Sequence, residues 1–215
     1  VLLLGASGAG KSTMMAGLAG VLGGDEEGEQ EGSLTIDGVD AREARGRVGL
    51  VLQDPDSQII LERLGDDAAF GCENLNVPRE EIWQRVRESL DMVGLGGLEL
   101  DRPPRHLSGG QRQAASLIMS TLTPIEFLIL DEHTAALDPK TAEIIMELTH
   151  KVVEEKKLTA MMVTHNLRYA VEYGTRLIMM DKGGIVMDKA DEEKKNTDID
   201  GILDVFTSIS IECGN

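Results

Sequence analysis

Residues 1–13, "VLLLGASGAGKST", decide the fold of this chain. Four apolar residues typical of a buried strand lead into a glycine-rich turn, and a helical run follows. The turn fits the pattern G-x-x-x-x-G-K-[ST], in which glycines let consecutive backbone N–H groups converge on a phosphate. In that pattern Lys11 reaches the outer phosphate oxygens and the Ser12 hydroxyl binds Mg²⁺. An ordinary glycine-rich turn is the alternative, but both flanks favour a phosphate loop. Its residues are Gly5, Ala6, Ser7, Gly8, Ala9, Gly10, Lys11, Ser12 and Thr13.

Alternating apolar strands and amphipathic helices fill the rest of the chain. Strand-like runs lie at 34–37, 48–53, 125–131 and 159–165, and 176–188 is typical of a hairpin turning on Gly183–Gly184. Helical periodicity predominates from 66 to 95, with Ile82, Val86, Leu90 and Val93 on one apolar stripe. This alternation predicts an α/β fold, a P-loop NTPase sheet with a RecA-like core. We expect one domain over 1–215, with an α-helical subdomain inserted at about 60–115.

Composition limits the environment and the partners. The 215 residues include 21 basic and 38 acidic side chains, a formal net charge of −17 that disfavours nucleic acid and anionic lipid. No apolar run approaches the ~18 residues of a membrane span. Cys72 and Cys213 lie far apart without metal-site spacing, which favours a reducing compartment. We expect a soluble cytosolic protein. Because the chain opens with Val in a core strand, we also expect an N-terminally truncated fragment.

Two acidic residues follow the apolar run "FLIL", residues 127–130. Asp131 would place a carboxylate at the carboxyl edge of the sheet, beside the phosphate loop, where Mg²⁺ binds. Glu132 would orient or deprotonate the water that attacks the outer phosphate. A structural pair that caps the next turn is the alternative, and the phosphate loop makes the catalytic interpretation the better one.

Two further polar residues follow strand-like runs that end at the same edge. A lone histidine in such a place is usually structural, but His165 comes after a third parallel-type strand and is predicted to contact the γ-phosphate. Gln53 follows the run at 48–52, and an amide there can contact both Mg²⁺ and the attacking water. The predicted catalytic residues are thus Glu132, His165 and Gln53, and the predicted metal ligands are Ser12, Gln53 and Asp131.

A second helix start of the phosphate-binding kind occurs at "HLSGGQRQ", residues 106–113. Small residues precede a polar helical run there, and the free N–H groups at a helix N-terminus attract anions. Ser108, Gly109, Gly110 and Gln111 are therefore predicted to contact phosphate. The phosphate loop lies about a hundred residues earlier, so the chain carries two such sites.

The ordered set "GASGAGKST", Gln53, "LSGGQ", "LILDE", "AALD" and "VTHN" resembles the nucleotide-binding subunit of ATP-binding-cassette (ABC) transporters. The resemblance covers roughly Val1 to Gly184, and "LSGGQ" is highly specific to that family. It implies ATP and Mg²⁺ as ligands and a head-to-tail pair of subunits, identical or different. Ser108 and Gly110 of one subunit would then complete the ATP site formed by the other's loop, and Asp138 would line the same interface. It also implies transmembrane permease subunits and a place at the cytoplasmic face of the cell membrane.

A finer resemblance changes along the chain. Up to Gln113 the sequence looks like the ATPases of energy-coupling-factor and cobalt-type importers, and after it like ATPases of binding-protein-dependent importers. The basic residues change at the same place: residues 1–113 have ten Arg and one Lys, and residues 114–215 have two Arg and eight Lys. We therefore hypothesise a mosaic joined near Gln113–Ser120. A further departure is His133, which stands where the family commonly has Pro, and we expect it to be harmless.

The sequence thus predicts the ATP-hydrolysing subunit of an ABC membrane transporter, an importer. Two alternatives stay open. One is an N-terminally incomplete, poorly active fragment. The other is a soluble ABC ATPase that acts on DNA or ribosomes, which the net charge of −17 disfavours.

Overall fold

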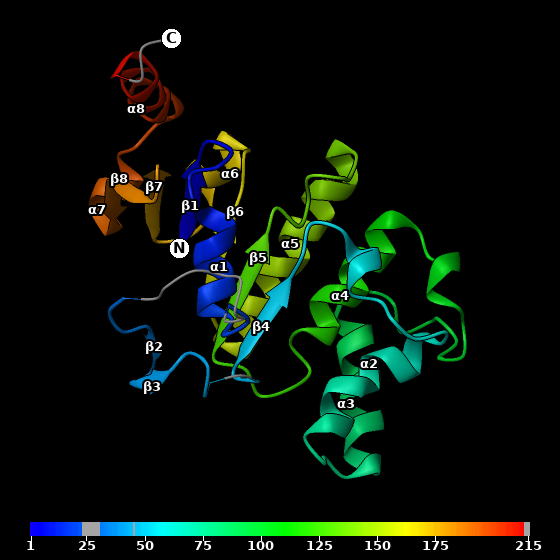
Figure 1. Cartoon of the computed structure of the whole chain (residues 1–215). Coiled ribbons are helices and arrows are strands. Elements are labelled where there is room, and N and C mark those ends of the chain that lie inside the picture. Colours follow the sequence, from blue (N-terminus) through cyan, green and yellow to red (C-terminus); the bar gives the residue numbers. More distant parts are fainter. Residues whose placement is uncertain (23–30, 45, 213–215) are drawn as a thin grey trace.

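A six-stranded sheet forms the centre of the protein in the computed structural model, which describes residues 1–22, 31–44 and 46–212 (Figure 1). Most of the acidic run 23–33 and Cys213 lie outside these residues. The first five strands in the sheet order are parallel, and the last is antiparallel. In spatial order the strands are β4 (Val48–Val51), β5 (Phe127–Asp131), β6 (Thr159–Val163), β1 (Leu2–Gly5), β7 (Arg176–Asp181) and β8 (Gly184–Ala190).

Helices cover both faces of the sheet, so its strands are apolar on both sides, as the continuous apolar runs predict. Leu3 packs in a cluster with Met15 of α1, whereas Leu2 and Leu4 belong to the larger cluster on the opposite face. The helices are α1 (Lys11–Leu18), α2 (Leu64–Asn74), α3 (Arg79–Met92), α4 (Gly109–Met119), α5 (Pro139–Lys156), α6 (Leu167–Glu172), α7 (Asp191–Lys195) and α8 (Ile199–Glu212). Short 3₁₀ turns lie at η1 (Pro55–Ser57) and η2 (Pro104–His106), and β2 (Thr35–Ile36) and β3 (Val39–Asp40) form a separate two-stranded sheet.

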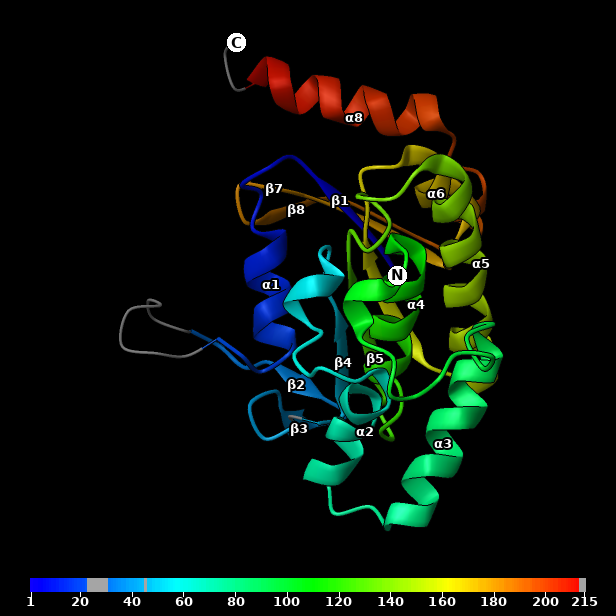
Figure 2. The ribbon, with the colours of Figure 1, turned by 90° about the vertical axis from the view of Figure 1, so that its right-hand side faces the viewer.

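The predicted apolar stripe of the 78–95 helix is confirmed: Ile82, Val86, Leu90 and Val93 are all buried. Helices α2 and α3 project beside the sheet as a helical lobe, and α4 lies between that lobe and α5 (Figure 2). One hydrophobic cluster runs from the lobe through α4 into the sheet. The lobe therefore shares its core with the rest of the molecule.

The hairpin of β7 and β8 turns on Lys182 and Gly183, one residue earlier than the sequence predicts. Both have positive φ angles, 47° and 80°, which suit the twist of a two-residue turn. Gly184 pairs with Asp181 as the first residue of β8. In the described part of the chain, no helix has the length and apolar character needed to cross a membrane.

Candidate active site

The phosphate loop joins β1 to α1, and its backbone conformation favours glycine at Gly5, Gly8 and Gly10. A Cβ on Gly5 would lie 2.4 Å from a backbone carbonyl oxygen of β7, so no side chain fits there. Gly8 and Gly10 adopt φ angles of 80° and 95°, in the region that favours glycine. The N–H of Gly183 donates to the carbonyl of Ala9 at 3.0 Å, and the hairpin turn thereby supports the loop. The loop conformation is fixed by its neighbours in the fold.

Lys11 is the first residue of α1, and its side chain folds back over the loop. It is 7% exposed, and its Nζ donates to the carbonyl oxygens of Gly5 at 2.8 Å and Ala6 at 3.0 Å. The side chains of Ser12 and Thr13, next along the first turn, are exposed. An ammonium group and a helix N-terminus at one place form a strong anion site.

The strand register brings the other predicted residues to the same edge of the sheet. Val51 pairs with Leu130, and Val163 pairs with both Asp131 and Leu3. Gln53 therefore follows β4, Glu132 follows β5, and His165 follows β6 where the parallel strands end. Gln53 is exposed, and no hydrogen bond of its side chain is found in the described part of the chain.

Glu132 and His165 contact each other directly. His165 Nε2 lies 2.7 Å from Glu132 Oε1, with 20% of the Glu132 side chain and 53% of the His165 side chain exposed. The backbone of Glu132 has a φ of 46°, a strained value for a residue with a side chain. Its N–H donates to the carbonyl of Val163 at 3.1 Å, which holds this conformation against β6. In this conformation the Glu132 carboxylate contacts His165, which follows the neighbouring strand β6.

Asp131 is half-buried at the end of β5. Burial and the neighbouring carboxylate of Glu132 raise the pKa of Asp131, while Lys11 and His165 oppose that rise. No group of three or more His, Cys, Asp or Glu side chains among the described residues forms a metal cage. This donor set fits Mg²⁺, which is usually held by one or two carboxylates together with substrate phosphates. When bound with a nucleotide, Mg²⁺ neutralises phosphate charge.

The second predicted phosphate site begins α4 and is a complete capping box. Ser108 Oγ accepts from the Gln111 N–H at 3.2 Å, and Gln111 Oε1 accepts from the Ser108 N–H at 2.9 Å. A Cβ on Gly110 would lie 2.5 Å from Thr141 Cγ2, so this glycine lets the turn pack against α5. Ser108 is exposed at this turn, and the first N–H groups of a helix have no partner within the helix.

The two predicted phosphate sites, at the start of α1 and at the start of α4, are apart in space. In both views α4 lies away from α1, with β4 and the segment after it between them (Figures 1 and 2). Asp138 caps α5 beside the α4 turn, where its Oδ1 accepts from the Thr141 N–H at 3.1 Å. Hydrogen bonds from the Thr141 side chain and from the Thr141 N–H lower the pKa of Asp138. The turn of α4 and the segment before α5 thus form one surface.

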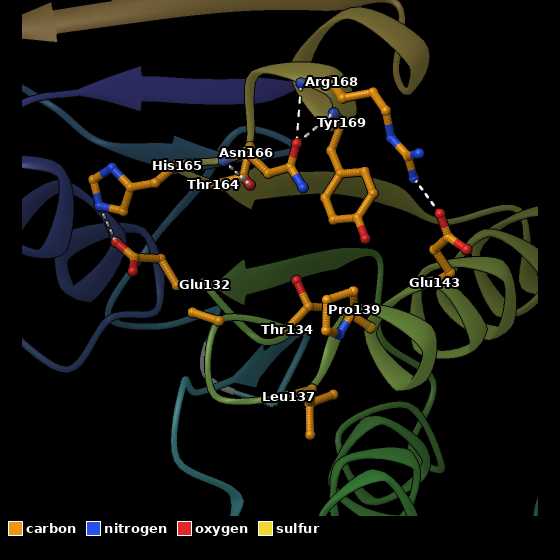
Figure 3. A pocket seen from close by; sticks show the side chains of 12 residues that line it. Glu132, Thr134, Leu137, Pro139, Glu143, Thr164, His165, Asn166, Arg168 and Tyr169 are labelled. Carbon is orange, nitrogen blue, oxygen red and sulfur yellow. Dashed lines mark hydrogen bonds and ion pairs between the residues drawn. The ribbon is translucent and has the colours of Figure 1, made fainter.

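A cavity of about 480 Å³ opens beside Glu132 and His165 (Figure 3). The sequence assigns no role to its other polar residues, which come from the segments after β5 and β6 and from α5 and α6. Arg168 pairs with Glu143 at 2.6 Å, and the Tyr169 ring lies between Asn166 and Pro139. The motif "VTHN" could have indicated this side of the cavity, because its last residue, Asn166, caps α6.

His133, the residue after Glu132, is completely buried. Its Nε2 lies 3.0 Å from Thr149 Oγ1, and the Thr149 hydroxyl itself donates to the carbonyl of Ile145. The Thr149 oxygen must then accept, so His133 carries its proton on Nε2 and its buried Nδ1 has no partner among the described residues. Burial lowers the pKa of His133 to about 4.

The stability of the fold is expected to depend on pH through His133. Between pH 6.5 and 4 the unfolded chain binds a proton there and the folded chain does not. The free energy of unfolding therefore decreases by about 3 kcal/mol as pH drops through this window, and it levels off below it. Urea unfolding at several pH values measures this loss. His133→Asn should remove that part of the pH slope. The same change at the exposed His106 is the control, and an unchanged slope in His133→Asn would contradict the assignment.

Comparison with known proteins indicates the family of this chain. The family described as "ABC transporter" matches residues 1–135. The tyrosine transport ATP-binding protein of Clostridioides difficile is 40% identical over 96% of this chain and 85% of its own. The energy-coupling factor transporter ATP-binding protein of Latilactobacillus sakei is 36% identical over 86% of this chain and 66% of its own. Among solved structures, cbiO1 from Clostridium perfringens, part of the ABC transporter complex cbiONQ, matches with a TM-score of 0.80 and 27% identity, over 98% of this chain and 82% of its own.

The loop, the strand-end carboxylates and the parallel sheet define a P-loop nucleoside triphosphatase of mixed α/β fold. The chain belongs to the ABC transporter family and is an ATP-binding subunit and ATPase of that family. The resemblance to this family is thereby confirmed.

Proposed function

We propose that this ATPase drives an importer and works as a head-to-tail pair of ATP-binding subunits. The observation that carries the proposal is the separation of α4 from α1: one chain has two phosphate-directed helix starts that do not face one site. In a head-to-tail pair, Ser108, Gly109, Gly110 and Gln111 of one subunit face the nucleotide held by the other's loop. Asp138 lines the same interface, next to the α4 turn. Two ATP molecules close the pair, and hydrolysis reopens it.

Within each site we assign roles to the residues at the sheet edge. The loop residues Gly5 to Thr13 bind the phosphates, with Lys11 moving from the loop carbonyls to the phosphate oxygens. Ser12, Gln53 and Asp131 would hold Mg²⁺. Glu132 accepts a proton from the attacking water, which Gln53 helps to place. His165 contacts the γ-phosphate and, through its contact with Glu132, orients that carboxylate.

We place the docking of transmembrane permease subunits in a groove between the segment after Gln53 and η2. This docking groove is a cavity of about 450 Å³ lined by Asp56, Ile59, Ile60, Leu61, Glu62, Pro103, Pro104, Arg105 and Arg112. Ile60 is 62% exposed there, although it is apolar. A lining that combines exposed apolar side chains with charged ones suits a segment of another protein. The subunit then lies at the cytoplasmic face of the cell membrane.

A tagged chain purified in mild detergent from membranes of its source cells is expected to bring permease subunits with it. Ile60→Glu should lose them and keep ATP binding, because a charge would replace apolar contact in the docking groove. Ile185→Glu on β8 is the matched control, since Ile185 is 60% exposed. Reconstituted in vesicles, the complex should move substrate toward the side that holds the ATPase. Movement away from that side would overturn the importer assignment.

A further inference from the structure

Arg112, in the first turns of α4, holds the peptide that precedes the capping serine. Its Nη1 donates to the carbonyl oxygen of Leu107 at 2.8 Å. That carbonyl shares a peptide plane with the N–H of Ser108, which donates to Gln111 Oε1 at 2.9 Å. The Arg112 guanidinium therefore fixes the orientation of the turn that the proposed function directs at the partner's nucleotide.

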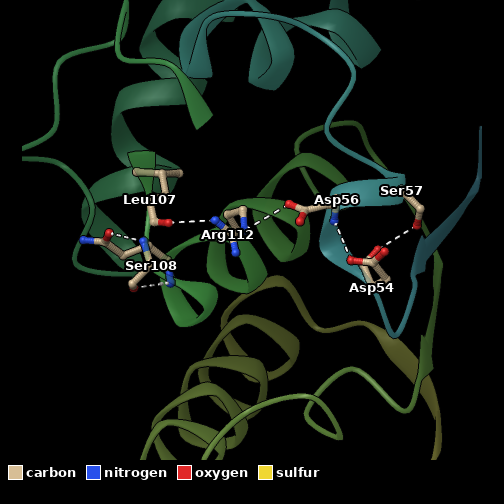
Figure 4. A network of polar contacts seen from close by, with 7 residues as sticks. Asp54, Asp56, Ser57, Leu107, Ser108 and Arg112 are labelled. Carbon is tan, nitrogen blue, oxygen red and sulfur yellow. Dashed lines mark hydrogen bonds and ion pairs between the residues drawn. The ribbon is translucent and has the colours of Figure 1, made fainter. Parts of the chain in front are cut away.

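The same guanidinium contacts the segment that follows Gln53 (Figure 4). Arg112 Nε lies 3.0 Å from Asp56 Oδ1, but its N–H is not aimed at that oxygen, so the contact is an ion pair without a hydrogen bond. Asp56 is itself held firmly in η1. Its N–H donates to Asp54 Oδ1 at 3.0 Å, and Ser57 Oγ donates to the Asp54 carbonyl at 2.6 Å.

The ion pair adds little to the stability of the fold. The side chain of Arg112 is 25% exposed and that of Asp56 is 64% exposed, and pairs of such exposure are weak because water screens them. Its position is more informative than its strength. Both residues line the docking groove, and the pair joins the segment after Gln53 to the α4 turn.

We propose that Arg112 is a positioning residue that keeps the Ser108 turn in register with the Gln53 segment through Asp56. The proposal rests on the proposed function, because the Asp56–Arg112 pair lies between the docking groove and the Ser108 turn that would face the partner's nucleotide. It makes the geometry of each α4 turn depend on the state of the Gln53 segment in the same chain. A permease segment in the docking groove would act on the same pair.

The first test separates catalysis from substrate binding and from folding. Arg112→Gln and Asp56→Asn should each lower kcat, by about tenfold for Arg112→Gln, which also loses a charge-assisted hydrogen bond. KM for ATP should change less than about twofold, because binding rests on the loop around Lys11. The double variant should be no slower than Arg112→Gln alone. Arg87→Gln is the control, since Arg87 is exposed on α3, outside the docking groove, and has no ion pair in the described part of the chain.

Arg112→Lys separates position from charge. A lysine keeps the cation near Asp56 but cannot hold the Leu107 carbonyl in the same fork geometry. Its kcat should therefore remain well below the parent value. The proposal is overturned if kcat equals the parent value in the two single variants, the double variant and Arg112→Lys. It is also overturned if a lower fraction of folded protein explains the whole loss of kcat.

The second test uses mixed dimers isolated with two affinity tags. Pairing an Arg112→Gln chain with a Lys11→Ala chain leaves one site with an intact loop and an intact α4 turn, so turnover should match one normal site. Pairing a parent chain with a Lys11→Ala/Arg112→Gln chain leaves only an intact loop that faces the altered turn, so turnover should be about tenfold lower. The reverse order would mean that Arg112 serves the site of its own chain, and equal rates would mean a purely structural role. If the subunits form no such pair, the proposed function fails instead, and the Lys11→Ala/Ser108→Arg pair described below shows which has failed.

Discussion

Glu132→Gln is expected to lower kcat for ATP hydrolysis by about a hundredfold or more while ATP binding is retained, because the amide cannot accept a proton from water. Binding depends on Lys11 and the loop N–H groups, which the change does not touch. The amide keeps the shape of the side chain, so its contact with His165 can persist as a neutral hydrogen bond. Turnover assays at saturating ATP and nucleotide titrations measure the two effects separately.

The same variant should accumulate as a closed pair of subunits in ATP, since reopening requires hydrolysis in the proposed function. Size-exclusion chromatography with and without ATP detects this. Glu143→Gln is the matched control: Glu143 lines the same cavity but pairs with Arg168 at 2.6 Å. Turnover of Glu132→Gln within a few-fold of the parent would show that another group accepts the proton.

Two inactive chains are expected to restore ATPase activity when they are mixed. Lys11→Ala removes the phosphate-binding ammonium, and Ser108→Arg fills the turn at the start of α4. In a mixed head-to-tail pair, one site has both defects. The other combines the intact Lys11 of one chain with the intact Ser108 of its partner, and this site should turn over at about half the activity of a parent pair if the two sites act independently.

The restored activity should fall on dilution, because it depends on association. A Ser108 that serves its own chain gives no restoration, since each chain then carries a fatal defect in its only site. Mixed pairs demonstrated by cross-linking but without turnover would therefore contradict the trans role, provided that one intact site suffices. Ser120→Arg, at the other end of α4, is a control for damage to that helix.

The edge that gathers the polar residues was predictable from sequence, because parallel strands end at one edge. The contact of Glu132 with His165 follows from that rule and from two short motifs. Other features depend on tertiary contacts that no pattern encodes. The sequence could not indicate that Lys11 rests on the loop carbonyls, or that Asp56 meets Arg112 across 56 positions of chain.

Ser108 and His133 show why local signals fall short of a full description. Ser108 was predicted as a phosphate contact, and its hydroxyl oxygen also closes a capping box with Gln111. A helix start needs caps whether or not it binds an anion, so the sequence alone does not separate the two uses. The sequence predicts a harmless His133 and does not indicate its burial, which leaves Nδ1 without a partner among the described residues. Whether a single side chain is buried depends on tertiary packing, which for His133 involves Thr149 of α5.

The continuous hydrophobic cluster through α4 restricts how proteins of this kind can exchange parts. Ala114, Ala115, Leu117 and Ile118 are at most 3% exposed, and their cluster includes residues of the lobe and of β5. A recombination joint within α4 would therefore cut through one interlocked packing arrangement. Both parents of such a chimera must supply complementary shapes, so shuffling experiments should succeed only when the lobe, α4 and the sheet face beneath it are inherited together or are redesigned as a unit.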